Sequence, residues 1–154
     1  NHTINILTAR GNKEGHKEIL QKLKNELLKN NININEEYFV SDPKQIPIHA
    51  SSAEKKMICI LEHIIGYKIK KFEFIPIVLD KYENSYFYDD EELNIETCKN
   101  INNYLKDYLD KTPAWLKDKI TQEINIRQPK LYLNTINTNE LNPFNTEIIE
   151  IKII

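Results

Sequence analysis

The chain has 154 residues, of which 40% are hydrophobic and 29% are charged, and its formal net charge is −2. This length and balance are typical of one globular domain and exclude a disordered chain. The near-neutral charge excludes a polybasic, histone-like module, and no apolar run reaches the length of about eighteen residues that a membrane span needs.

Apolar periodicity predicts strands and helices that alternate along the chain. Short apolar runs that end at polar residues or Pro indicate strands, and apolar residues spaced by three and four indicate helices. Ser52 is suited to cap the start of one helix and Gly66 its end, and Pro113 suits the first turn of another. In chain order we expect a strand at 3–7, a helix at 16–29, a strand at 37–40, a helix at 53–65, strands at 72–79 and 85–88, helices at 92–109 and 113–124, and strands at 130–136 and 146–153.

This order of elements predicts an α/β fold with a Rossmann-like parallel sheet and helices on both of its faces. Residues 1–112 would form the core of this fold, and residues 113–154 would add a C-terminal helix and a small β appendage. Cys59 and Cys98 are 39 residues apart and lack metal-ligand spacing, so we interpret them as free core thiols. Free thiols favour a reducing intracellular compartment, the cytoplasm or the mitochondrion.

Polar residues follow three of the predicted strands, where open α/β sheets bind their ligands. Thr8 ends the first strand, Lys55 and Lys56 lie at the start of the helix after the second, and Asp89 and Asp90 follow the strand at 85–88. A hydroxyl can donate to a phosphoryl oxygen, an ammonium group neutralises its charge, and carboxylates are the hard oxygen ligands that Mg²⁺ prefers. These residues therefore predict a phosphate and Mg²⁺ site.

Each of these residues also has a structural interpretation. Thr8 can simply cap a turn, and either lysine can be a solvated surface residue, because 19 of the 21 basic residues are Lys. Asp89 and Asp90 can form only the acidic first turn of a helix, which the helix dipole favours. The tyrosines of the 85–88 strand, beside the acids, can stack on a nucleic-acid base or pack in the sheet.

Three segments resemble, in order, the second, third and fourth motifs of the haloacid dehalogenase (HAD) superfamily of phosphohydrolases. The resemblance covers residues 3–110 and is closest to capless members of the nucleic-acid-repair type, the Swiss Army Knife RNA-repair-like group. The segments are Ile6-Leu7-Thr8-Ala9-Arg10, Ser52-Ala53-Glu54-Lys55-Lys56, and Tyr86-Phe87-Tyr88-Asp89-Asp90 followed by Asn94.

The resemblance implies a Mg²⁺-dependent reaction in which an aspartate attacks phosphorus and the aspartyl-phosphate is then hydrolysed. The resemblance implies that Thr8 binds the transferring phosphoryl group and that Asp89 and Asp90 hold the Mg²⁺ ion. It also implies that a lysine, Lys56 in preference to Lys55, stabilises the charge of the nucleophile and the phosphoryl group. The substrate would be a phosphorylated nucleotide, another phosphorylated small molecule or a phosphorylated nucleic-acid end.

The first motif of that family, Asp-x-Asp-x-Thr, which supplies the nucleophile, does not occur among the 154 residues. Asp80 lacks the second acid, and Asp107 and Asp110 fall in a predicted helix with the wrong spacing. Because the chain begins at Asn1 without Met, we expect a fragment or processed product whose nucleophile lies upstream. The alternative is a non-catalytic HAD-like structural subunit with protein partners in a larger assembly, ribonucleoprotein or mitochondrial.

Overall fold

The computed structural model describes residues 4–8, 14–31, 34–39, 50–136 and 144–154. The chain divides into two compact units, residues 1–56 and 57–154, each with its own internal contacts. Its secondary structure is mixed α/β, as predicted, and none of the helices described is both long and apolar enough to cross a membrane.

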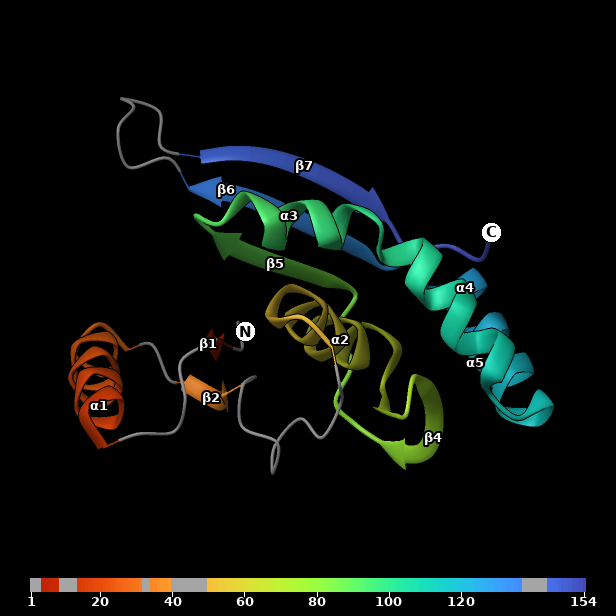
Figure 1. The fold of residues 1–154 in the computed structure, drawn as a ribbon, viewed down its shortest axis with the longest axis horizontal. Coiled ribbons are helices and arrows are strands. Elements are labelled where there is room, and N and C mark those ends of the chain that lie inside the picture. Colours follow the sequence, from red (N-terminus) through yellow and green to blue (C-terminus); the bar gives the residue numbers. More distant parts are fainter. Residues whose placement is uncertain (1–3, 9–13, 32–33, 40–49, 137–143) are drawn as a thin grey trace. The chain divides into compact units, whose positions relative to one another are not determined.

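The first unit contains a strand–helix–strand motif (Figure 1). β1 (Ile4–Thr8) and β2 (Ile34–Phe39) pair in parallel, and α1 (Glu14–Lys29) connects them. A parallel pair requires a crossover connection of this kind, because the chain must return to the same end of the sheet. Beyond the end of α1, Asn31 has a positive φ of 61°, a conformation that Asn tolerates after a helix. The strands and the helix predicted at this end of the chain are confirmed.

α2 (Ser52–Ile65) begins in the first unit and continues into the second. The hydroxyl of Ser51 accepts the Glu54 backbone N–H at 3.1 Å, so Ser51 caps the helix and the prediction of Ser52 was wrong by one residue. Gly66 ends α2 with φ of 89°, as predicted. A Cβ at this glycine would lie 2.9 Å from the Cδ of Lys81, so the position lacks room for a side chain as well.

A hairpin follows α2 directly. β3 (Tyr67–Lys70) and β4 (Glu73–Val78) are antiparallel, and Lys71 and Phe72 form the turn between them with φ of 53° and 61°. The sequence predicted only the second of these strands. β3 begins one residue after Gly66 and is only four residues long, which leaves no separate apolar run to signal it.

The second unit also contains a three-stranded sheet, drawn from dark green to blue in Figure 1. β5 (Asn84–Asp89) pairs in parallel with β6 (Lys130–Ile136), and β6 pairs antiparallel with β7 (Phe144–Glu150). β6 is therefore the central strand, and the last two strands, expected as an appendage, share a sheet with β5. The described strands form one three-stranded and two two-stranded sheets, and no single Rossmann-like parallel sheet is seen among them.

Three helices connect β5 to β6: α3 (Glu92–Lys99), α4 (Ile101–Lys111) and α5 (Ala114–Arg127). The prediction of one helix over 92–109 was wrong, because the chain breaks at Asn100. The side-chain amide of Asn100 donates to the Glu96 carbonyl oxygen at 3.1 Å, and its backbone N–H donates to the Thr97 oxygen. Such local bonds compete with helix hydrogen bonding and bend the chain.

The core of the second unit consists of apolar side chains from α2, the β3–β4 hairpin, the three-stranded sheet and the helices α3, α4 and α5. α3 lies against β5 and β6, and α4 and α5 lie against β4. Thr112 links α4 to the hairpin, because its Oγ1 accepts the buried Phe74 N–H at 3.0 Å and donates to the Tyr108 carbonyl at 2.6 Å. The largest fully buried side chains are Met57, Ile58, Leu61, Ile64, Ile65, Phe74, Ile101, Leu105, Leu109, Leu116, Ile120 and Ile124.

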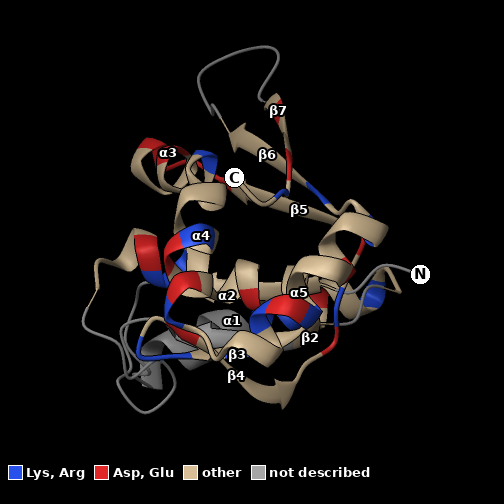
Figure 2. Ribbon diagram, turned by 90° about the vertical axis from the view of Figure 1, so that its right-hand side faces the viewer, with Lys and Arg blue, Asp and Glu red and all other residues tan. Residues whose placement is uncertain are grey.

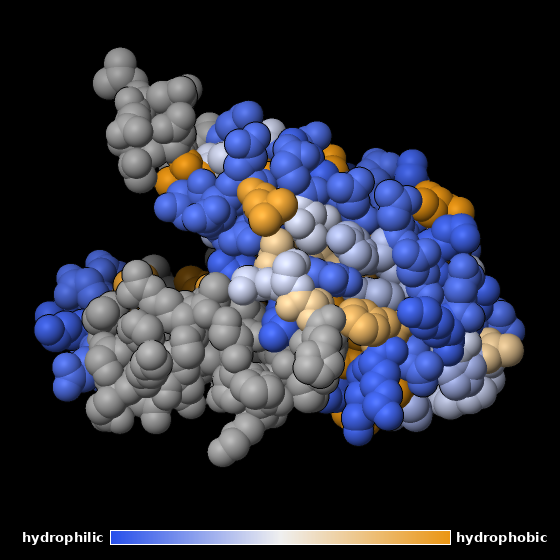
Figure 3. Space-filling model, in the orientation of Figure 1, coloured by the Kyte–Doolittle hydropathy of each residue, from blue (hydrophilic) through white to orange (hydrophobic). Residues whose placement is uncertain are grey.

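The described surface carries charges of both signs. Figure 2 shows basic and acidic residues interspersed along α4 and α5. On the face shown in Figure 3, hydrophobic residues occur in small groups among hydrophilic ones. Neither sign of charge dominates the described residues in Figure 2, in agreement with the net charge of −2.

Candidate metal and phosphate site

Asp89, the last residue of β5, is held in place through both of its carboxylate oxygens. Oδ1 accepts the backbone N–H of Glu91 at 2.8 Å, and Oδ2 accepts the side-chain amide of Asn94 at 2.9 Å. Asp89 is 9% exposed and Asn94 is 8% exposed, so the contact between them is buried. Donated hydrogen bonds stabilise the negative charge of a carboxylate. The structure thus presents one fixed carboxylate at the carboxyl end of β5.

The local sequence explains why the carboxylate is fixed. Glu91 is the N-cap of α3, but its own side chain makes no capping hydrogen bond. Asp89 stands two residues earlier, and its bond to the Glu91 N–H closes the turn between β5 and α3. Asn94 lies on the buried side of the first turn of α3, from which its amide reaches back to Asp89. The Asp-Asp-x-x-x-Asn spacing therefore forms one compact unit.

The ligand chemistry of this unit suits a cation. The Glu91 N–H and the Asn94 amide each bind one oxygen of the Asp89 carboxylate, which as an ionised group is a strong oxygen ligand. Asp90, the next residue, is exposed. Mg²⁺ is commonly held by one or two carboxylates together with waters and phosphate oxygens. The donor chemistry of Asp89 and Asp90 fits that ion, although the described residues contain no cluster of three or more Asp, Glu, His or Cys side chains.

Lys56 and Thr8 belong to the first unit. Lys56 lies in the first turns of α2 and is only 8% exposed, whereas Lys55 beside it is half-buried. Lys56 is therefore not the solvated surface lysine of the structural interpretation. Thr8 is the last residue of β1, as predicted, but its side chain lies outside the described part of the chain. The convergence of these two residues with the acids of the second unit stays a prediction.

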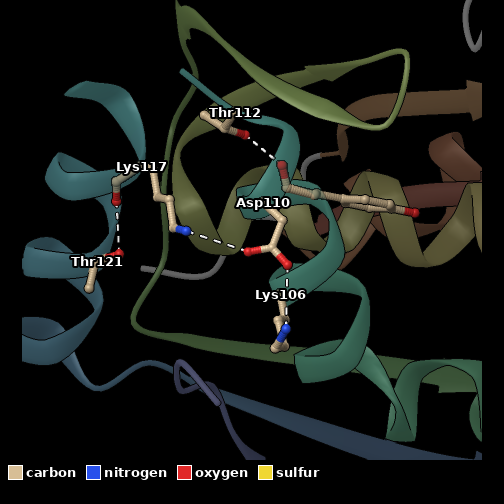
Figure 4. A network of polar contacts seen from close by, with 6 residues as sticks. Lys106, Asp110, Thr112, Lys117 and Thr121 are labelled. Atoms are coloured by element: carbon tan, nitrogen blue, oxygen red, sulfur yellow. Dashed lines mark hydrogen bonds and ion pairs between the residues drawn. The ribbon is translucent and has the colours of Figure 1, made fainter. Parts of the chain in front are cut away.

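Asp110, one of the acids weighed as a displaced nucleophile, has a structural role. Asp110, on α4, accepts from Lys106 at 3.3 Å and from Lys117 of α5 at 3.4 Å (Figure 4). These contacts, first the hydrogen bond from Lys106, hold the pKa of Asp110 below its usual value. The carbonyl oxygen of Asp80 contacts Nδ1 of His63 at 3.0 Å. Asp110 thus links two helices, and the Asp80 backbone carbonyl, not its carboxylate, provides the contact with His63.

The structure also shows a buried acid that the sequence did not predict. Glu62, on α2, is 7% exposed, and its Oε2 accepts the Ile69 backbone N–H at 2.9 Å. Burial raises the pKa of Glu62, and the Ile69 hydrogen bond opposes this increase. In the sequence, the only indication that Glu62 is buried was its spacing of four residues from Ile58 and three from Ile65, which places it on the apolar face of the helix.

Both cysteines are free and buried, as predicted. Burial, followed by the negative charge of Glu62, raises the pKa of Cys59 well above its ordinary value. A thiol must ionise to act as a nucleophile, so Cys59 is unsuited to that role. Comparison of the chain with protein-family models, with curated proteins and with solved structures finds no match.

Proposed function

We propose that this chain is part of a HAD-type, Mg²⁺-dependent phosphohydrolase that acts on a phosphorylated nucleotide or nucleic-acid end. The observation that supports it best is the buried Asp89 carboxylate at the carboxyl end of β5. The Asn94 amide and the Glu91 N–H fix this carboxylate by hydrogen bonds, and the next residue, Asp90, is exposed. The proposal includes the Rossmann-like parallel sheet expected from the sequence. The two parallel pairs, β1–β2 and β5–β6, are compatible with that sheet.

In this proposal each residue has a separate role in binding Mg²⁺ or the phosphoryl group. Asp89 and Asp90 hold Mg²⁺, which when bound neutralises charge on phosphoryl oxygens. Asn94 and the Glu91 N–H orient the Asp89 carboxylate, as outer hydrogen-bond partners commonly do for metal ligands. Lys56 neutralises the transferring phosphoryl group, and the Thr8 hydroxyl donates to it. The proposal requires a nucleophilic aspartate in an Asp-x-Asp-x-Thr motif, which the 154 residues do not contain.

The test uses the natural full-length protein. Its upstream sequence is determined first, and phosphate release from 5′- and 3′-phosphorylated oligonucleotides and from nucleotides is then measured with and without Mg²⁺. Asp89→Asn should lower kcat/KM by at least about tenfold, the scale seen when the surroundings of a metal ligand are changed. The matched control is Asp107→Asn on α4, which should leave the rate unchanged. An upstream segment without Asp-x-Asp-x-Thr, or equal rates for the two variants, would overturn the proposal.

A non-catalytic structural subunit is the second candidate, and one observation favours it. Both oxygens of Asp89 accept hydrogen bonds from groups at the start of α3, so a structural role in this turn is enough to explain an aspartate at this position. Isothermal titration of the chain with MgCl₂ separates the candidates. Binding that Asp89→Asn weakens supports the phosphohydrolase, and the absence of Mg²⁺ binding in both proteins supports the structural subunit.

A further inference from the structure

Three tyrosines lie on one face of the β5–β6–β7 sheet. Side chains alternate between the two faces of a strand, so Phe87 and Asp89 of β5 lie on one face and Tyr86 and Tyr88 on the other. Phe87 is buried on the face against which α3 packs, seen on one side of the sheet in Figure 2. Tyr86 and Tyr88 are 53% and 54% exposed. We call their face the tyrosine face; its remaining residues follow from the strand register.

Tyr86 stacks on a tyrosine of the neighbouring strand, β6. Tyr132 of β6 is its register partner, and the two rings stack with centroids 4.6 Å apart and an interplanar angle of 14°. Ile148 of β7 is in turn the partner of Tyr132 and is 55% exposed. Tyr86 is half exposed and Tyr132 is partly exposed, so the stacked pair does not fill a core. It offers an ordered aromatic surface on which another flat ring can stack.

We infer that the tyrosine face binds single-stranded nucleic acid by base stacking and so sets the substrate class of the proposed phosphohydrolase, on which this substrate role rests. Sheets bind single strands in this way, with aromatic side chains on neighbouring strands stacking two or three bases. Tyr86 and Tyr88 are two residues apart, about 7 Å along the strand. Tyr88 immediately precedes Asp89, whose side chain lies on the opposite face of β5, so a single strand stacked on these rings reaches the proposed phosphate site by passing over the carboxyl end of β5.

The charges on this face indicate stacking rather than backbone neutralisation. Lys130 and Glu150 pair with each other across β6 and β7, beside the Tyr132–Ile148 row, and Asn134 and Thr146 form the row on the other side. The tyrosine face thus carries one basic and one acidic residue in these rows. For single strands the logarithm of affinity falls by about 0.7 per neutralised phosphate for each tenfold rise in salt. We therefore expect affinity to fall by only about threefold between 50 and 200 mM KCl.

The test measures fluorescence anisotropy of a fluorescein-labelled hexauridylate titrated with the chain in EDTA, so that the proposed Mg²⁺ site plays no part. Tyr86→Ala should raise Kd by about tenfold, the scale of losing one base–aromatic stack. Tyr86→Phe should bind with the Kd of the native chain, because the phenyl ring keeps an aromatic face on which a base can stack. The matched control is Trp115→Ala on α5, which removes an aromatic side chain that is 60% exposed and should leave Kd unchanged.

The outcomes separate this inference from the proposed function. Asp89→Asn should leave hexauridylate affinity in EDTA unchanged, whereas in the full-length protein it should lower Mg²⁺-dependent hydrolysis by at least about tenfold. Loss of the binding effect alone overturns the inference, and loss of the hydrolysis effect alone overturns the proposed function. No binding at 100 μM chain, equal Kd values for Tyr86→Ala and Trp115→Ala, or a salt dependence much steeper than threefold would overturn the inference. A dimer in light scattering that Tyr86→Ala dissociates, without oligonucleotide binding, would replace it with a contact between two copies of the chain.

Discussion

Removal of the Asn94 amide tests the centre of the candidate site. In the native chain this amide donates to Asp89 Oδ2 at 2.9 Å, and both residues are more than nine-tenths buried. Asn94→Ala leaves a buried carboxylate with one donor fewer. A hydrogen bond to a charged group contributes about 1.5–3 kcal/mol to stability. For a chain of this size that loss lowers the Tm by about 4 to 10 °C.

The assay is urea and thermal denaturation followed by far-UV circular dichroism at pH 7. Asn103→Ala, an exposed substitution on α4, is the control and should change stability by less than about 0.5 kcal/mol. A double-mutant cycle with Asp89→Ala and Asn94→Ala isolates the pair, and we expect a coupling free energy of about 1 kcal/mol or more. A coupling within about 0.3 kcal/mol of zero would show that the bond does not fix Asp89.

The remaining predictions concern the buried polar groups and the hairpin turn of the second unit. Burial raises the pKa of Glu62, so the folded state binds its proton more tightly and stability falls as pH rises above the unfolded value near 4.5. Glu62→Gln keeps an acceptor for the Ile69 N–H without the charge, so its stability relative to the native chain should increase from pH 4 to pH 7.5 in urea titrations; a constant difference would contradict the role of burial. Thr112→Val should cost about 1–3 kcal/mol, because it leaves the buried Phe74 N–H without an acceptor. Thr121→Val is its control, since the Thr121 hydroxyl only donates to the Lys117 carbonyl within α5, and equal costs for the two would refute the argument. Lys71→Gly should stabilise the chain by about 1 kcal/mol by relieving a positive φ, whereas Lys70→Gly in the adjacent strand should destabilise it, as thermal melting would show.

Local sequence signals located most of the helices and strands. β1, α1, β2, α2, β4, β5, α5, β6 and β7 all overlap predicted elements, because their apolar spacing matches the period of the structure that they form. The misses share one cause, a local hydrogen bond or turn without an apolar signature. Asn100 divides a predicted helix through its side chain, and β3 follows Gly66 too closely to form a separate apolar run.

The candidate site was predicted in part. Asp89, Asp90 and Asn94 are five residues apart at most, so a strand–turn–helix motif brings them together without help from the rest of the chain. The sequence did not reveal that Asp89 is bonded through both oxygens, because this depends on how the turn places Asn94. Thr8 and Lys56 are separated from the acids by more than thirty residues, so their part in the site depends on contacts between distant segments.

The sequence by itself determined the mixed α/β composition, the two free thiols and the acids at the end of β5. Only the tertiary structure decided how strands pair: β6, more than forty residues after β5, lies beside it, and β7 reverses direction on its other edge. It also decided that Tyr86 and Tyr88 are exposed while Glu62 is buried. The physical reason is range: periodicity and capping act over a few residues, whereas strand partners and burial are set by packing between segments far apart in the chain.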